Sequence, residues 1–253
     1  MTVAHTVARN GVLVLRPAES AVRTAAAIGG LGRVPVLMPL ARIVDTEDPI
    51  PLGDYDAVAF TSAAAVRVVS GRRDGAKTSL LAIPAICVGE ATAAAARAAG
   101  WREAVSAEGD ADALAGLLAH RFEGRDAKIL YLCGRDRAFD LSAALSPRGI
   151  AIAEIAIYAA ELVDPPCQEL KDKVRICDSA LLHSARTARH FFTNAKRCDA
   201  DLSKLTMLAI SETVAAAIPA ELRSAARVAA HPDEPAMLAL LERGSDSDPD
   251  MKQ

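Results

Sequence analysis

Short apolar runs alternate along the chain with longer segments in which alanine recurs among polar residues. The runs are rich in branched side chains and mostly four or five residues long, which is typical of buried strands, whereas the longer segments have helical length and spacing. Strands are predicted over Val12–Leu15, Val34–Leu37, Leu40–Val44, Asp56–Phe60, Ala85–Val88, Lys128–Leu132, Ile150–Tyr158, Ser179–His183, Thr206–Ile210 and Val228–Ala230. Helices are predicted over Glu19–Gly29, 63–70, Ala91–Ala99, Leu114–Arg121, Phe139–Leu145, 185–192, Val214–Ile218 and Glu234–Arg243. Strands that alternate with helices indicate βα units in parallel sheets.

Blocks of sequence recur in the same order in the two halves of the chain. DAVAFTSAAAVRVV, from Asp56, resembles DSALLHSARTARHFF, from Asp178, and ICVGEATAAAA, from Ile86, resembles LAISETVAAAI, from Leu208; both offsets are 122 residues. The first strand, within VLVLRPAES, similarly resembles KILYLCGRDRA. The shared order favours two α/β lobes of similar topology. Chance matching of alanine-rich segments is the alternative.

The composition is that of an ordinary globular protein, and it argues against several classes. The 253 residues suffice for two domains, and 51% are hydrophobic, which argues against disorder. A net charge of −3 leaves no basic excess for binding nucleic acid. No apolar stretch has the ~20 residues of a membrane span, and Met1–Asn10 lacks the apolar core of a signal peptide. Five cysteines without a CxxC pair predict free thiols and a cytoplasmic location.

Four predicted strands end in small hydroxylic or glycine residues just before a helix. These junctions lie at Thr61-Ser62, Gly89–Thr92, Ser184–Thr187 and Ser211–Thr213. Each hydroxyl can cap its helix, and the N–H groups at a helix start can also bind an anion. Because ligands of parallel sheets bind at the carboxyl ends of the strands, the junctions predict a cleft for a polyanionic ligand. Capping alone is the alternative at each position.

Motifs of several other enzyme classes do not occur in the sequence. Gly29–Gly32 does not match GxGxxG, and Gly71–Lys77 is one residue short of a phosphate-binding loop. There is no GxSxG or HExxH, and the five histidines show no metal-ligand spacing. The sequence therefore argues against a dinucleotide oxidoreductase, a Ser/His hydrolase and a zinc enzyme.

An ordered set of short motifs resembles the uroporphyrinogen-III synthase family. The motifs are VLRP, FTSAAAV, VGEATA, IAIYAAE, LHSARTARHFF and AISETVAAAI, and the resemblance runs from about Val12 to Leu241. It implies two similar parallel-sheet α/β lobes, joined by a connector of two antiparallel strands, with the active site between the lobes. One lobe would hold residues 1–37 and 165–253 and the other residues 45–152, with connector strands at 38–44 and 153–164.

The activity that this resemblance implies is closure of the linear tetrapyrrole hydroxymethylbilane to uroporphyrinogen III, with inversion of ring D and loss of water, in haem biosynthesis. It implies a lyase that uses no cofactor and no metal, with this small molecule as its partner and no nucleic acid or membrane. The substrate carries eight carboxylates, which suits hydroxyl and N–H donors at helix starts. We expect a monomer, because no long apolar stripe is left over once both lobes are built.

The resemblance also implies site residues by position. Tyr158 matches the family's connector tyrosine and is the candidate proton donor to the departing hydroxyl; packing between the lobes is its alternative role. Candidate substrate-binding residues are Arg16, Thr61, Ser62, Thr92, Arg135, Ser184, Ser211 and Thr213. The two arginines fit as carboxylate clamps, with surface salt bridges as the alternative.

The sequence departs from the family pattern mainly in the lobe that holds residues 165–253. The family's threonine before Ser184 is His183, and its glycine and threonine in IGPxT are Ser211 and Val214; in the other lobe Ala64 replaces an asparagine. We expect these departures to change the binding contacts. They also sustain the alternative of a two-lobed ligand-binding or regulatory protein without catalysis. A nucleotide-dependent α/β enzyme is a further alternative, and the missing glycine motif argues against it.

Overall fold

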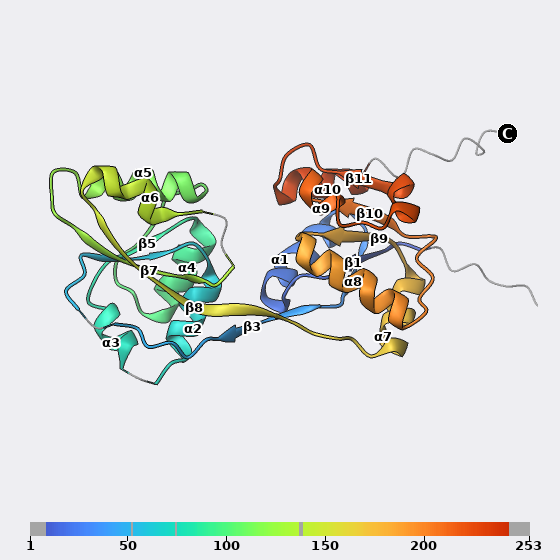
Figure 1. Ribbon diagram of the computed structural model, residues 1–253, viewed down its shortest axis with the longest axis horizontal. Coiled ribbons are helices and arrows are strands. Elements are labelled where there is room, and N and C mark those ends of the chain that lie inside the picture. The colour runs from blue at the N-terminus through green and yellow to red at the C-terminus, as the bar shows by residue number, and fades with distance from the viewer. Residues whose placement is uncertain (1–8, 52, 74, 137–138, 243–253) are drawn as a thin grey trace, which may run out of the picture. The chain divides into compact units, whose positions relative to one another are not determined.

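The computed structural model describes residues 9–242 except 52, 74, 137 and 138, so most of the N-terminal segment considered for a signal peptide lies outside it. The chain divides into two compact units, Met1–Arg42 with Glu161–Gln253, and Ile43–Ala160. These are called the split unit and the continuous unit below. Figure 1 labels their helices and strands.

The split unit is built on a five-stranded parallel sheet with the order β11-β10-β9-β1-β2. Its strands are β1 (Gly11–Val14), β2 (Val34–Leu37), β9 (Cys177–Leu182), β10 (Thr206–Ala209) and β11 (Ala226–Val228). Its helices are α1 (Ala18–Gly30), α7 (Cys167–Ile176), α8 (Ala185–Arg197), α9 (Glu212–Ala215), α10 (Glu234–Glu242) and the 3₁₀ helix η2 (Ala220–Ala225). β1 lies between β2 and β9, so the sheet is completed only by distant parts of the chain.

Helices cover both faces of this sheet. Leu13 and Leu15 pack in one apolar cluster with residues of α7, α8 and α9, whereas Val12 and Val14 pack in another with residues of α1 and α10. Successive side chains of a strand point to opposite faces, which is why a central strand covered on both sides is a continuous apolar run. The fully buried β1 has this pattern.

The continuous unit is built on a six-stranded sheet with the order β3-β8-β7-β4-β5-β6. Its strands are β3 (Ala41–Asp45), β4 (Ala57–Phe60), β5 (Ala85–Cys87), β6 (Ala104–Ser106), β7 (Lys128–Gly134) and β8 (Ala151–Leu162). Its helices are α2 (Ala63–Gly71), α3 (Ala76–Leu80), α4 (Glu90–Ala99), α5 (Ala111–Arg121), α6 (Leu141–Leu145) and the 3₁₀ helix η1 (Ser146–Arg148). Helices α2, α3 and α4 pack on one face, and α5 and α6 on the other (Figure 1).

The two sheets have the same strand order. From β6 to β8 the continuous unit reads β6-β5-β4-β7-β8, all parallel, and each strand matches its counterpart in β11-β10-β9-β1-β2. Equivalent hydrogen bonds recur 122 residues apart: Val88 N–H donates to the Phe60 carbonyl at 3.0 Å, and Ile210 N–H to the Leu182 carbonyl at 3.1 Å. The predicted fold, two similar parallel-sheet α/β lobes, is confirmed.

The chain passes from one unit to the other within β3 and β8, which are neighbours in the sheet. The Val163 N–H donates to the Leu40 carbonyl at 2.9 Å, and the Thr46 N–H donates to the Ile157 carbonyl at 3.1 Å. As the residue number rises along β3 it falls along β8, so the two strands run antiparallel.

Besides the two short 3₁₀ helices, three described elements were missed in the sequence: α3, β6 and α7. The first two have five and three residues, too few to show a period. In α7, CQELKDKVRI, only Leu170 and Val174 are buried. Two apolar residues spaced by four give a weak helical signal.

The prediction of five free thiols is wrong. Cys167, at the start of α7, forms a disulfide with Cys198, which directly follows α8. Their Cα atoms lie 5.0 Å apart across 31 residues of sequence, a tertiary contact that cysteine spacing does not reveal. The other three cysteines, Cys87, Cys133 and Cys177, are buried and form no disulfide with a described residue. With one pair bonded, the thiols no longer argue for a reducing compartment.

Candidate functional site

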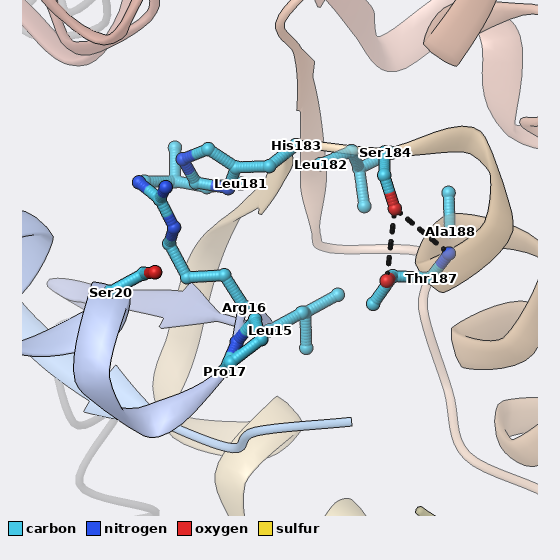
Figure 2. A pocket seen from close by; sticks show the side chains of 10 residues that line it. All are labelled: Leu15, Arg16, Pro17, Ser20, Leu181, Leu182, His183, Ser184, Thr187 and Ala188. Carbon is cyan, nitrogen blue, oxygen red and sulfur yellow. Dashed lines mark hydrogen bonds between the residues drawn. The ribbon is translucent and has the colours of Figure 1, made fainter. Parts of the chain in front are cut away.

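A pocket of about 140 Å³ opens at the carboxyl ends of β1 and β9 in the split unit. Figure 2 shows its lining: Arg16 follows β1, His183 and Ser184 follow β9, Ser20 comes from α1 and Thr187 from α8. Two predicted binding residues that are far apart in the sequence, Arg16 and Ser184, therefore line one pocket. Their place at strand ends is the one at which open parallel sheets bind ligands.

Ser184 caps the helix whose first turn forms one wall of the pocket. Its hydroxyl accepts a hydrogen bond from the Thr187 N–H at 3.1 Å and donates one to Thr187 Oγ1 at 2.9 Å (Figure 2). The first N–H groups of a helix have no partner within the helix, and they form the positive end of its dipole. The thirteen-residue α8 thus favours an anion at this wall.

Arg16 is fixed by an ion pair at the edge of the pocket. Its Nη1 donates to Glu234 Oε2 at 3.0 Å and to Thr24 Oγ1 at 3.1 Å, and the buried Thr24 hydroxyl donates to Glu234. Burial raises the pKa of the Glu234 carboxyl, but the Thr24 hydrogen bond and the Arg16 charge outweigh it and lower the pKa overall. Glu234 is therefore charged at neutral pH and balances the charge of Arg16.

His183 lies on the same pocket with both ring nitrogens buried, and neither has a hydrogen-bond partner in the part of the chain that the structure describes. Burial lowers the pKa of the imidazole to about 4; the positive charge of Arg16 adds to this effect, whereas the negative charge of Glu234 and a weaker interaction with the Leu181 backbone, which falls short of a hydrogen bond, oppose it. The imidazole is therefore neutral at neutral pH. In that form it carries one donor and one acceptor nitrogen.

Thr61 and Ser62 occupy the equivalent strand end of the continuous unit. Thr61 Oγ1 and the Tyr131 hydroxyl share a hydrogen bond of 3.1 Å, and Tyr131 is 1% exposed on the neighbouring β7. Ser62 caps α2 by accepting from the Ala64 N–H at 3.1 Å. The Thr61 hydroxyl, which precedes the capping Ser62, thus has a hydrogen-bond partner within the continuous unit, whereas His183, which precedes the capping Ser184, has none among the described residues.

Tyr158, the candidate acid, lies on β8 against Gly134 of β7. A Cβ added to Gly134 would lie 2.8 Å from the Tyr158 ring, so the absence of a side chain at Gly134 leaves room for the ring. Burial raises the pKa of the phenol, and a hydrogen bond with Ser62 lowers it by less. The phenol therefore stays protonated at neutral pH and can donate. This brings Tyr158 and Ser62, two predicted site residues, together within the continuous unit.

The other predicted binding residues lie away from the pocket lining. Thr92 is buried in the first turn of α4, and Arg135 is exposed just after β7. Ser211 caps the short α9 by accepting from the Val214 N–H at 3.4 Å, and Thr213 is exposed on that helix. The binding roles of these residues stay predictions.

Sequence reasoning missed Thr24 and Glu234 as partners of Arg16. Glu234 lies more than two hundred residues from Arg16, at the start of α10. No local motif connects an arginine after the first strand with an acidic residue that opens the last helix. In the sequence His183 stands out by its place at a strand end before Ser184 and as a departure from a family pattern, but its lack of a partner is visible only in the structure.

Neither a membrane segment nor a metal cluster occurs among the described residues. Within that part of the chain no helix combines the length and the apolar character needed to cross a bilayer. The same residues contain no group of three or more His, Cys, Asp or Glu side chains placed to hold a metal ion.

The fold and the strand-end donors define a class: two-lobed α/β proteins with duplicated parallel sheets and paired connecting strands. The family model of uroporphyrinogen-III synthase HemD matches residues 22–239, and the chain belongs to this family. A comparison with curated proteins finds no match.

Solved structures are similar over nearly the whole chain. Uroporphyrinogen-III synthetase from Helicobacter pylori has a TM-score of 0.60 and 18% identity, covering 92% of this chain and 99% of the other. A mutant uroporphyrinogen III synthase from Thermus thermophilus has a TM-score of 0.45 and 19% identity, covering 92% and 97%. At 18% identity, the similarity to the Helicobacter pylori structure supports the fold alone.

Proposed function

We propose that the chain is a uroporphyrinogen-III synthase, which closes hydroxymethylbilane to uroporphyrinogen III with inversion of ring D and loss of water. The observation that carries the proposal is the family match over residues 22–239, together with Tyr158 seated against Gly134 and near Ser62. The enzyme is a lyase of tetrapyrrole biosynthesis. A cytoplasmic location, a monomeric state and independence of any cofactor are parts of the proposal.

The binding part of the mechanism rests on the strand ends of each unit. The substrate's eight carboxylates need hydrogen-bond donors, and the N–H groups at the starts of helices supply them. In the split unit these are the first turn of α8 and the fixed charge of Arg16. Holding a flexible chain in one folded geometry lowers the entropic part of the barrier, and isomer control follows from the geometry in which the chain is held.

The chemical part rests on Tyr158. Its phenol, protonated at neutral pH, donates to the hydroxyl that departs as water when the carbon–oxygen bond breaks. A raised pKa makes the phenol a weak acid, so its contribution to the rate lies at the low end for general acids, about 10²-fold. Substrate folding is therefore the larger source of catalysis.

The test is incubation of the protein with enzymatically prepared hydroxymethylbilane, followed by separation of the type I and type III isomers. Unassisted closure yields the uninverted type I isomer, so a blank without protein provides the baseline. We expect type III to predominate with the protein. A product mixture equal to that of the blank would contradict the proposal and favour the two-lobed binding protein without catalysis.

A further inference from the structure

An unpaired imidazole at a pocket needs an explanation. Leaving a buried donor or acceptor without a partner costs about 1–3 kcal/mol, and buried polar groups are therefore nearly always hydrogen-bonded. Both His183 nitrogens are buried and unpartnered among the described residues, although hydroxyl groups of Ser20, Ser184 and Thr187 line the same pocket. Packing alone does not explain why an imidazole is kept here.

The geometry gives the pocket two different walls. Figure 2 shows the Arg16 side chain reaching from the end of β1 toward the imidazole of His183, while Ser184 and Thr187 at the start of α8 lie on the other side. The Ser184 hydroxyl is engaged with Thr187 through both its donor and its acceptor function. Among the side chains that line the pocket, His183 is thus the one whose buried polar atoms have no hydrogen-bond partner within the described protein.

The charges around His183 come from two elements and cancel. Arg16, after β1, is positive, and Glu234, at the start of α10, is negative and paired with it at 3.0 Å. The groups from α1 and α8 that line the pocket, Ser20, Ser184 and Thr187, carry no charge. Protonating the imidazole in the free protein would place a third charge beside Arg16, and this opposes protonation.

A carboxylate reverses this balance. It brings one negative charge to a pocket of zero net charge, it accepts hydrogen bonds from both walls, and it favours the charged form of a neighbouring imidazole. A cation would be repelled by Arg16 and by the positive end of α8. An uncharged ligand would not stabilise the imidazolium form of His183.

We propose that His183 is a specificity-determining residue for a substrate carboxylate: it is neutral and unpaired in the free protein, and it takes up one proton from solvent when the carboxylate enters the pocket. The proton binds the free imidazole nitrogen, and the resulting imidazolium hydrogen-bonds the carboxylate. The proposal rests on the function proposed above, because it takes the ligand to be an acidic tetrapyrrole. It adds a binding step in which proton uptake accompanies the substrate.

The test follows His183 directly by NMR. Labelling histidine at ring carbon Cε1 gives five histidine signals from the whole chain, and His183→Thr identifies the one that belongs to His183. The signal is titrated with and without uroporphyrinogen III, kept reduced under argon. We expect the titration midpoint of His183 to rise by about three pH units in the complex. His231, which does not line the pocket, serves as the internal reference.

Affinity measurements supply the second readout. With a free pKa near 4 and a bound value about three units higher, wild-type affinity should fall about tenfold from pH 6 to pH 8. His183→Gln keeps hydrogen-bonding capacity but does not titrate, so its affinity should depend less on pH. Calorimetry in two buffers of different ionisation enthalpy should give close to one extra proton bound by wild type at pH 6.

Each outcome decides between the two proposals. If uroporphyrinogen III binds but the His183 midpoint does not move, the role of His183 is overturned while the proposed function stands. Equal proton uptake by wild type and His183→Thr also overturns it. If uroporphyrinogen III perturbs no signal of the folded wild-type protein, both proposals fail together.

Discussion

Thr61 and His183 occupy the same place in two equivalent sheets, but their surroundings differ. Each is the first residue after its strand, and the residue that follows it, Ser62 or Ser184, caps the next helix. In the continuous unit the Thr61 hydroxyl is hydrogen-bonded to Tyr131 on the neighbouring strand. In the split unit the neighbouring strand β1 ends before Arg16, and no described residue bonds the imidazole.

The difference shows how a duplicated fold specialises its two strand ends. In the continuous unit the buried Tyr131 hydroxyl satisfies the Thr61 hydroxyl, so Thr61 stabilises the unit and only the neighbouring Ser62 caps the helix. Where the group is left unpaired, as at His183, the unit loses stability, and the binding role proposed above would offset that loss. A buried polar group without a hydrogen-bond partner is an exception that is expected at functional or strained sites.

The largest predicted effect on stability is the pH dependence that His183 imposes. Its folded pKa of about 4 lies below the unfolded value of 6.5, so the unfolded state binds the proton more readily. The associated stability is fully present above pH 6.5 and is lost as the pH falls toward 4. Urea unfolding at pH 7.5 and 4.5 should show wild type losing about 2–3 kcal/mol more than His183→Thr.

The matched variant in the other unit is Thr61→Ser. Neither side chain titrates, so the free energy of unfolding of Thr61→Ser should follow that of wild type across the same pH range. If the free energies of unfolding of wild type and His183→Thr changed equally with pH, the imidazole would not be buried in a neutral form.

Tyr158→Phe should reduce kcat by about 10²-fold without unfolding the protein. The reason is that the hydroxyl is lost while the ring still packs against Gly134. Turnover of hydroxymethylbilane and the ratio of type III to type I product are the measurements.

Tyr55→Phe is the control for this variant. Tyr55 stacks near Lys128 at the opposite, amino end of β7, with 4.8 Å from the Lys128 nitrogen to the ring. It should keep wild-type kinetics. A Tyr158→Phe enzyme with full rate and full type III yield would remove Tyr158 from the mechanism and leave it as a packing residue.

Tyr131→Phe should cost about 1–2 kcal/mol of stability, because it leaves the Thr61 hydroxyl without its partner. Adding Thr61→Val should restore part of this loss, since both polar groups are then gone. Urea unfolding of the two single variants and the double variant forms a double-mutant cycle. Additive costs would mean that the hydrogen bond contributes nothing, and the contrast with His183 would then weaken.

The smallest effect is expected from the cap Ser184. Ser184→Ala should lower stability by about 1 kcal/mol and raise KM several-fold, because the first turn of α8 forms a wall of the pocket. Asp110→Ala removes a comparable cap, the acceptor for the Ala113 N–H of α5, and should cost similar stability with KM unchanged. Equal kinetics in both variants would reduce Ser184 to a structural cap.

Much of the fold was readable because it depends on local patterns that occur twice. Apolar runs such as Val12–Leu15 predict strands, and the recurrence of the Asp56 block at Asp178 predicts equivalent units; both expectations agree with the sheets. The candidate site was readable only in part. Arg16 and Ser184 follow strand ends, but the pairing of Arg16 with Glu234 and the bond of Cys167 with Cys198 depend on tertiary contacts.

The position of β1 between β2 and β9 has a consequence for how the protein folds during synthesis. β1, α1 and β2 leave the ribosome first, but β9, the strand that pairs with the other edge of β1, ends only at Leu182. At roughly 5–20 residues per second this interval is about seven to thirty seconds. The continuous unit, Ile43–Ala160, is synthesised entirely within it and can fold while the first apolar strand waits. Chains released between Ala160 and Leu182 should therefore contain a complete continuous unit and an unfinished split unit whose apolar surface is open to chaperones and proteases.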